Sequence, residues 1–289
     1  MADTNFLMDN LRGSVPIEIA NEVIKGIVTD SIALQICKKV PMQSDTKVLP
    51  MLTDSGKAYW VDEGEKIGTT LNAWKYPELV AKKLAVIIPV TREKLSDSVL
   101  DVMEELKSGI AEQFVKAIDS AVFFGTDSPF ESSVFGAIEE ESKVECESES
   151  EFATSISNAL GKVEQYDLVP NSIVASPTQK KVIRNAKDSN GNALITNTGV
   201  LEQSSIYQTP ISYVTSGAFD NSRAQVLVGD FSRAILGIRD DIEYSTMTQG
   251  TVGDINLGER DIIAIKCTMR IAFNCVDSKA FALVKPITA

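Results

Sequence analysis

Chemistry in this 289-residue chain would have to come from carboxylates and thiols, because the sequence contains no histidine. The densest group of carboxylates comprises Glu139, Glu140, Glu141, Glu145, Glu147, Glu149 and Glu151. The last four alternate with Cys146, Ser148 and Ser150, and in a strand this spacing places every carboxylate on one face. Such a face could bind a divalent cation. We favour the simpler interpretation, a solvated edge strand or loop protected by its charge.

The absence of histidine removes the commonest general base, the serine-type relay and the HExxH zinc site. The cysteines are Cys37, Cys146, Cys267 and Cys275. They contain no CxxC pair, so we interpret them as reduced, buried or incidental thiols. The sequence also lacks the GxxxxGK[ST], GxGxxG and GxSxG motifs. We therefore expect no catalytic residue, no metal site and no cofactor, and an enzyme is the weaker hypothesis.

Composition indicates an ordinary globular protein with one large or two smaller domains, since 44% of the residues are hydrophobic. A net charge of -12 argues against sequence-reading nucleic-acid binding, because phosphate contacts need clustered lysine and arginine. The longest apolar run, Leu84 to Val90, is far shorter than the roughly 20 residues that span a bilayer. The N-terminus shows no signal-peptide pattern. We expect an intracellular product that is neither secreted nor inserted in a membrane.

A ribbon between Val48 and Leu84 is the element that most needs a partner. Its pattern predicts two strands joined by a polar, glycine-containing tip from Glu63 to Asn72. Arms of about a dozen residues would extend on the order of 40 Å at about 3.3 Å per residue. Because an isolated two-stranded ribbon is marginally stable in water, it needs something to pack on. Another copy of the same chain is the simplest support.

Two helices flank this ribbon in the sequence. After it, apolar residues keep a 3.6-residue periodicity from Val99 to Val122, and Gly125 supplies a natural stop. This pattern predicts a long helix that lies across a sheet. Before the ribbon, Ser31 can cap a short helix that ends near Cys37.

From about residue 154 the pattern becomes an α/β arrangement. A helix through Leu160 precedes a strand at Ile173 to Ala175, and a second helix begins at Ser176. Further strand-like runs lie at 211–214, 224–228 and 234–238. The last part of the chain, from Asp261 to Val284, returns to extended structure. We therefore interpret the segment 154–250 as an insertion between two parts of another domain.

Several short pieces of sequence are weak signals alone but specific in their order. They are Ala58 to Gly64, Lys83 to Leu95, Ile118 to Gly125, Lys187 to Gly191, Val228 to Ser232, Met269 with Arg270, and Ala280 to Leu283. In this order the chain resembles the major capsid proteins of tailed double-stranded DNA bacteriophages. The resemblance implies the α+β, HK97-like capsid fold.

That resemblance also implies four parts. They are an N-terminal arm (1–45), an extended β-hairpin loop or E-loop (46–84), a peripheral domain (85–153 and 251–289) with a long spine helix at about 96–124, and an axial domain (154–250). The implied function is that of a structural shell protein in the virion head. Its pentamers and hexamers would form an icosahedral-type shell around packaged double-stranded DNA, after assembly in the host cytoplasm.

The expected partners are further copies of the chain, a portal protein and a scaffolding protein. The scaffolding is expected to be separate because the arm is too short to contain the cleaved segment of many family members, unless the chain is a processed form. Contact with packaged DNA would be non-specific, and no membrane is involved. Two alternatives remain open at this point. One is an encapsulin-like nanocompartment shell protein with the same fold, and the other is a soluble carboxylate-dependent metal enzyme that uses residues 139–151.

The resemblance places the extended loop over a neighbouring subunit, where aromatic side chains often dominate interface energy. The candidate contact residues are Tyr59, Trp60, Glu63, Gly64, Lys66 and Gly68. Trp60 could instead be an ordinary core aromatic of its own subunit. Candidate axial turns, at ring contacts or simply at the surface, are Asp188, Asn190 and Gly191.

Overall fold

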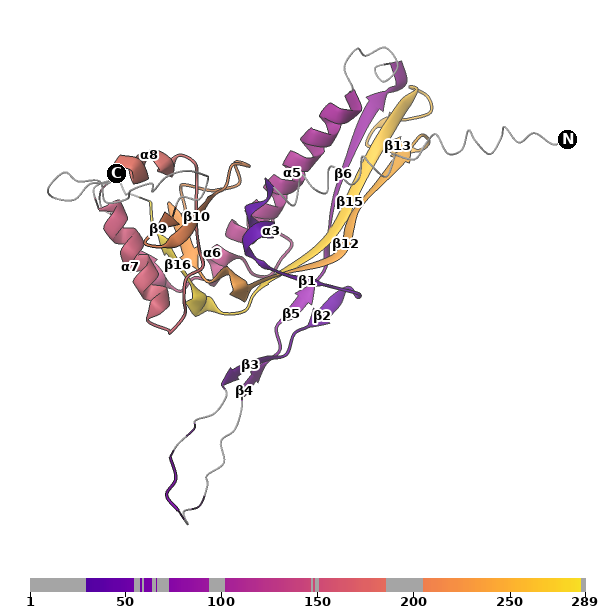
Figure 1. Ribbon diagram of the computed structural model, residues 1–289. Coiled ribbons are helices and arrows are strands. Elements are labelled where there is room, and N and C mark those ends of the chain that lie inside the picture. Colours follow the sequence, from indigo (N-terminus) through magenta and orange to yellow (C-terminus); the bar gives the residue numbers. More distant parts are fainter. Residues whose placement is uncertain are drawn as a thin grey trace.

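The structure is a computed structural model that describes residues 30–54, 58, 60–63, 66, 73–93, 102–146, 148, 151–185 and 205–286. Within these residues the chain forms two bodies, each built on its own sheet, and a slender loop that extends away from both (Figure 1). The long strands of the first body run alongside a long helix.

The first body contains a four-stranded sheet in the order β1-β12-β15-β6. Its two central strands, β12 (Ala234–Met247) and β15 (Ile262–Cys275), are antiparallel, and irregularities interrupt their pairing between Ile238 and Glu243. The edge strand β6 (Lys82–Thr91) pairs antiparallel with β15, whereas β1 (Lys38–Pro41) is parallel to β12.

The helix α5 (Val102–Phe124) packs along one face of this sheet (Figure 1). The shared core includes Ile110, Phe114 and Ile118 from the helix, and Leu236, Ile265, Cys267, Met269 and Phe273 from the strands. β6 alternates as predicted, because Leu84, Val86 and Ile88 pack against this core while Ala85 and Ile87 are exposed. The prediction of a long helix across a sheet is confirmed. The part of that helix predicted before residue 102 lies outside the described residues.

The second body contains a six-stranded sheet in the order β7-β16-β11-β8-β10-β9. These strands are β7 (Lys143–Val144), β16 (Phe281–Val284), β11 (Val226–Gly229), β8 (Ser172–Ala175), β10 (Thr209–Tyr213) and β9 (Ser205–Ile206). Every residue of β8, β11 and β16 is buried, as expected of strands covered on both faces. The helix α7 (Phe152–Glu164) packs on the sheet, and α8 (Gln179–Asn185) contributes Ile183 to the same core.

Short elements complete the fold. They are the helices α3 (Ile32–Ile36) and α6 (Val134–Ala137), the 3-10 turns η1 (Glu140–Ser142), η2 (Phe231–Arg233) and η3 (Ser278–Ala280), and the hairpin of β13 (Thr251–Val252) with β14 (Ile255–Asn256). The predicted cap of α3 is confirmed, because Ser31 Oγ accepts a hydrogen bond from Leu34 N at 3.2 Å.

Strand pairing crosses the predicted division of the chain in two places. β12 lies in the predicted axial segment 154–250 but is hydrogen bonded within the four-stranded sheet. β16 lies in the predicted peripheral segment 251–289 but is hydrogen bonded between β7 and β11 of the six-stranded sheet. Sheet membership of these two strands thus does not follow the predicted division of the sequence, since alternating apolar residues identify a strand without identifying the sheet that it joins.

The carboxylate-rich stretch 139–151 is not one alternating strand. Glu140 and Glu141 lie in η1, and the strand β7 covers only Lys143 and Val144 at the edge of the second sheet. Glu145 follows that strand and is exposed. The interpretation as a charged edge strand or loop is therefore confirmed for the described part of this stretch.

A buried carboxylate joins three distant segments of the first body. Asp119 on α5 is fully buried, and its Oδ1 accepts hydrogen bonds from Ser31 Oγ at 2.7 Å and from Ala33 N at 3.1 Å. Its Oδ2 accepts a third from Ser216 Oγ at 3.2 Å. Burial raises the pKa of Asp119, and these hydrogen bonds oppose that rise without cancelling it.

Because of this burial, the Asp119→Asn variant should gain stability relative to the wild type as pH rises. The folded-state pKa of Asp119 lies above the 3.8 typical of an exposed aspartate. Its stabilising contribution is therefore complete below about pH 3.8 and is lost as the pH rises through the folded-state pKa. Asparagine keeps an acceptor for Ser31 but does not titrate. Urea unfolding of both proteins from about pH 4 to about pH 8 measures the difference, and a pH-independent difference would contradict the prediction.

Two glycines provide a matched test of packing. A Cβ on Gly229 would lie 2.4 Å from the Ala280 carbonyl oxygen and 2.6 Å from the Phe281 ring, whereas a Cβ on Gly161 would meet nothing within 4 Å. We predict that Gly229→Ala lowers the free energy of unfolding by about 1–3 kcal/mol or more. Gly161→Ala, in the last turn of α7, should raise it by up to about 1 kcal/mol. Equal effects of the two substitutions in urea unfolding would show that the close approach of β11 and β16 is unimportant.

Candidate assembly surface

The extended loop is a hairpin built from two short ladders. β2 (Thr46–Val48) pairs antiparallel with β5 (Glu78–Val80) near the body of the protein. Further out, β3 (Met51–Asp54) pairs antiparallel with β4 (Ala73–Lys75). Figure 1 shows this hairpin pointing away from both sheets. The ribbon predicted between Val48 and Leu84 is therefore confirmed over its described strands.

An apolar cluster fixes the loop where it joins the first sheet. We call it the base cluster, and its buried members are Met42, Leu79, Ile235 and Ala272. Gly237 on β12 makes room for it, since a Cβ there would lie 2.4 Å from Met42 Sδ. Asn274 Nδ2 on β15 also donates a hydrogen bond to the Glu78 carbonyl oxygen at 2.8 Å. These contacts give the loop a fixed direction of exit.

Ion pairs reinforce the turn that leads into the loop. Asp45 pairs with Arg239, and its Oδ1 lies 3.4 Å from Arg270 Nη1. Arg270 Nε in turn lies 3.6 Å from Asp240 Oδ2. Because Asp45 and Asp240 are exposed, each pair contributes little stability by itself. Their combined effect is to hold the chain near Asp45 against β12 and β15.

Beyond the base cluster, the loop exposes large apolar side chains. The indole of Trp60 is fully exposed, at 103% of its reference area, and Val48, Leu52, Trp74 and Tyr76 are also exposed. Leu52 and Trp74 are cross-strand partners in the outer ladder. Exposed aromatic residues gathered on one slender element indicate a surface that another molecule covers. The alternative that Trp60 belongs to the core of its own subunit is excluded.

The predicted contact residues are only partly within the described chain. Trp60, Glu63 and Lys66 are described and exposed. Tyr59, Gly64 and Gly68 lie outside the described residues, as do the predicted axial turn residues Asp188, Asn190 and Gly191. Leu52, Trp74 and Tyr76, also exposed on the loop, were not among the predicted contact residues. Trp74 and Tyr76 follow closely after the polar tip that ends at Asn72. This closeness was a signal that could have identified the return strand of the loop as part of the assembly surface.

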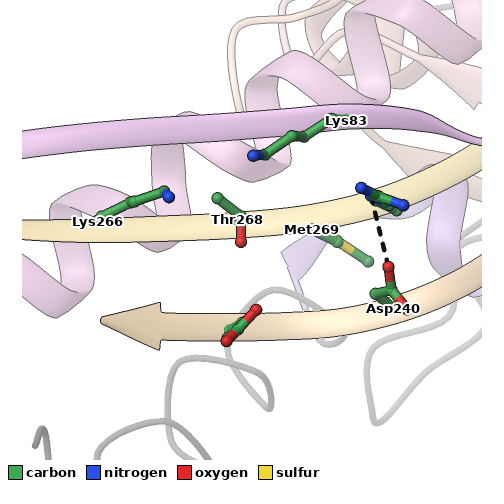
Figure 2. A pocket seen from close by; sticks show the side chains of 7 residues that line it. Lys83, Asp240, Lys266, Thr268 and Met269 are labelled. Carbon is green, nitrogen blue, oxygen red and sulfur yellow. Dashed lines mark ion pairs between the residues drawn. The ribbon is translucent and has the colours of Figure 1, made fainter.

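A polar pocket of about 230 Å³ lies on the first sheet. It is lined by Lys83, Asp240, Glu243, Lys266, Thr268, Met269 and Arg270. Figure 2 shows that Lys83 on β6, Lys266 on β15 and Asp240 on β12 share one face of the sheet. Opposite charges are mixed across this pocket, so it presents no single strong field of one sign.

The thiols are free and poorly placed for nucleophilic chemistry. Cys37, Cys146 and Cys267 are buried, and Cys275 is half-buried. Burial raises the pKa of Cys267 and Cys275 to about 12 and that of Cys37 further still. A thiol that stays protonated at neutral pH is a poor nucleophile and metal ligand.

Among the described residues, no three acidic or cysteine side chains form a group that could hold a metal ion. None of the described helices is long and apolar enough to cross a membrane.

Comparison with known proteins gives consistent matches. The model of the phage capsid family matches residues 13–285. The major capsid protein of Staphylococcus phage 80alpha is 28% identical over 294 residues, which cover 98% of this chain and 88% of that protein. A solved structure from Microbacterium phage Oxtober96 has a TM-score of 0.79 at 28% identity and covers 89% of this chain and 91% of its own. One from Mycobacterium phage Adephagia has a TM-score of 0.78 at 25% identity, covering 90% and 91%.

The two-sheet body, the long helix and the extended loop thus define a capsid protein with the HK97-like fold, as the sequence predicted. Because the family model spans nearly all of the sequence, the chain belongs to the phage capsid family. Its function is structural, as a protein that forms shells. Phage capsid proteins are part of the virion head.

Proposed function

We propose that this chain is the major shell subunit of a bacteriophage head, assembling as pentamers and hexamers into an icosahedral-type shell around double-stranded DNA. The observation that carries the proposal is the extended loop, whose exposed aromatic residues have no place in its own core. The 28% identity to a protein named as a major capsid protein supports the same role. The nanocompartment and metal-enzyme alternatives receive no comparable support.

Burial of the aromatic side chains of the loop supplies the energy for assembly. An aromatic side chain buries about 150–250 Å², which corresponds to roughly 4–6 kcal/mol at about 25 cal/mol per Å². Part of this energy offsets the loss of motion when two subunits associate. The base cluster lowers that loss, because the loop is already held in an extended conformation before it meets a neighbour.

Each sheet has its own role in this proposal. The four-stranded sheet with α5 forms the peripheral domain, and the six-stranded sheet with α7 and α8 forms the axial domain around the symmetry axes. Asp188, Asn190 and Gly191, predicted from the sequence to form a turn, lie in the second sheet's part of the sequence and would lie near those axes. A portal protein and scaffolding complete the assembly in the host cytoplasm.

Electrostatics suits a container better than a DNA-binding protein. The net charge of -12 disfavours tight contact with a polyanion. Charges more than about 8–10 Å apart are largely screened at physiological salt, so the repulsion between wall and DNA acts only at close range. Exposed Lys39 can reduce it locally.

The size of the purified full-length protein tests the proposed function directly. Size exclusion with light scattering, followed by electron microscopy, should show capsomers or closed particles. A protein that stays a monomer or small oligomer at every concentration would overturn the proposal.

Truncation of the loop surface should impair assembly without unfolding the subunit. Trp74→Ala removes an exposed side chain, so its circular dichroism should match the wild type. Loss of an interface aromatic typically costs about 2 kcal/mol or more, equivalent to roughly thirtyfold weaker association. Light scattering should therefore show a large fall in particle yield.

Leu79→Ala is the matched control for this experiment, because Leu79 is fully buried in the base cluster. It should instead lower the free energy of unfolding by about 2–5 kcal/mol. Normal particle yield from Trp74→Ala would show that the outer ladder is not an assembly surface.

The acidic subunit also predicts weak retention of DNA. Empty particles mixed with double-stranded DNA should elute separately from it at about 0.15 M salt, because an acidic protein makes few phosphate contacts and gains little from counterion release. Co-elution of DNA with the particles at that salt would contradict weak binding of DNA by the shell protein.

A further inference from the structure

A groove lies where the extended loop leaves the body of the protein. Its volume is about 370 Å³, within the roughly 300–1,000 Å³ of sites that bury a ligand-sized group. Its apolar lining consists of Val40, Leu49, Pro50, Met51 and Ile235, and its polar lining of Lys38, Asp230, Ser232 and Arg233. The groove is therefore built jointly by β1, the base of the loop, η2 and the start of β12.

Of the charged side chains at the rim of this groove, Asp230 and Arg233 form an ion pair with each other, whereas Lys38 does not take part in it. Asp230 Oδ1 accepts hydrogen bonds from Asn171 Nδ2 at 2.9 Å and from Ser232 N at 3.1 Å, and its Oδ2 lies 3.6 Å from Arg233 Nε. Lys38 is exposed and forms no ion pair within the described part of the chain. The groove thus offers an apolar surface beside an available positive charge.

Complementary chemistry occurs at the outer part of the loop. Trp60 exposes its whole indole, and Asp62 and Glu63 follow it with exposed carboxylates. An indole matches the apolar lining of the groove, and the carboxylates match the charge of Lys38. Trp60 is fully exposed in its own subunit and so fills no groove there, which leaves its indole available to a groove of another molecule.

The polar pocket in Figure 2 is a poorer match for the same segment. It is smaller, about 230 Å³ against about 370 Å³, and Met269 is its only apolar lining residue. Its carboxylates, Asp240 and Glu243, lie among Lys83, Lys266 and Arg270, so its charges are mixed. Size and apolar lining favour the groove at the base of the loop, where the one carboxylate, Asp230, is already bound by its own neighbours.

We propose that Trp60, Asp62 and Glu63 of one subunit bind the groove at the base of the extended loop of a second copy of the chain. This inference rests on the proposed function and names the surface that receives the loop. The contact is heterologous, because it joins two different surfaces, and repetition around an axis can close it into a ring. Since Leu49, Pro50 and Met51 belong to the receiving loop, each bound loop would also brace the next one.

A charge exchange in the full-length protein tests this contact. Lys38→Glu alone, and Asp62→Lys with Glu63→Lys, should each lower particle yield by about tenfold or more, because like charges then face each other. The combination of all three substitutions should restore much of the yield. Lys83→Glu, in the polar pocket, is the control and should assemble like the wild type. Circular dichroism checks that these exposed substitutions leave the fold intact.

Covalent trapping gives an independent readout. Particles assembled from a variant with Lys38→Cys and Asp62→Cys should form disulfide-linked multimers on oxidation, and particles with either substitution alone should not. Wild-type yield from Lys38→Glu, no rescue in the combined variant, or no multimers from assembled particles would each overturn the inference. These results would leave the proposed function intact, whereas failure of the wild-type protein to form particles would count against that function itself.

Discussion

The attachment of the extended loop to the first sheet is the contact on which the assembly surface depends. A two-stranded hairpin has no core of its own, and Leu79, buried with Met42 and Ile235, supplies the packing that it lacks. The absence of a side chain at Gly237 permits this packing, and the hydrogen bond from Asn274 to Glu78 fixes the return strand. Residues far beyond this point, such as Trp74, are held in place although they contact little of the body.

Stability and assembly are assigned to different parts of the chain. One core surrounds α5 and extends from the first sheet to Val174, Leu227 and Leu283 of the second, and the other surrounds α7. The exposed aromatic residues lie on an element that adds little to either core. Inside the first body, Asp119 contributes to the arrangement of the segments more than to stability. Its buried carboxylate is costly, but its three hydrogen bonds join α3, α5 and the segment at Ser216 in a single arrangement. These hydrogen bonds hold α3 against α5 just before the chain enters β1.

Local patterns in the sequence predicted the local elements well. The alternation in β6, the periodicity of α5 with its end before Gly125, and the cap at Ser31 all depend on neighbouring residues. Membership of β12 and β16 in their sheets depends on pairing between distant segments and could not be read in this way. The same limit applies to the groove, which brings Lys38, Leu49 and Arg233 together from three separate regions. Trp60 was recognised as a candidate, but an aromatic residue in a strand pattern fits a core as well as an interface, and only its exposure decides between them.

The position of β6 at the edge of the first sheet has a consequence for the kind of object that this chain can build. A strand of this length at an edge is a template on which another chain could add a strand and extend the sheet without limit. Lys82, Lys83 and Pro89 lie along it, and lysine and proline at an edge oppose such pairing. Growth by backbone pairing would give a fibre. By discouraging it, this edge leaves side-chain contacts to set the curvature between subunits, and a curved surface can close on itself.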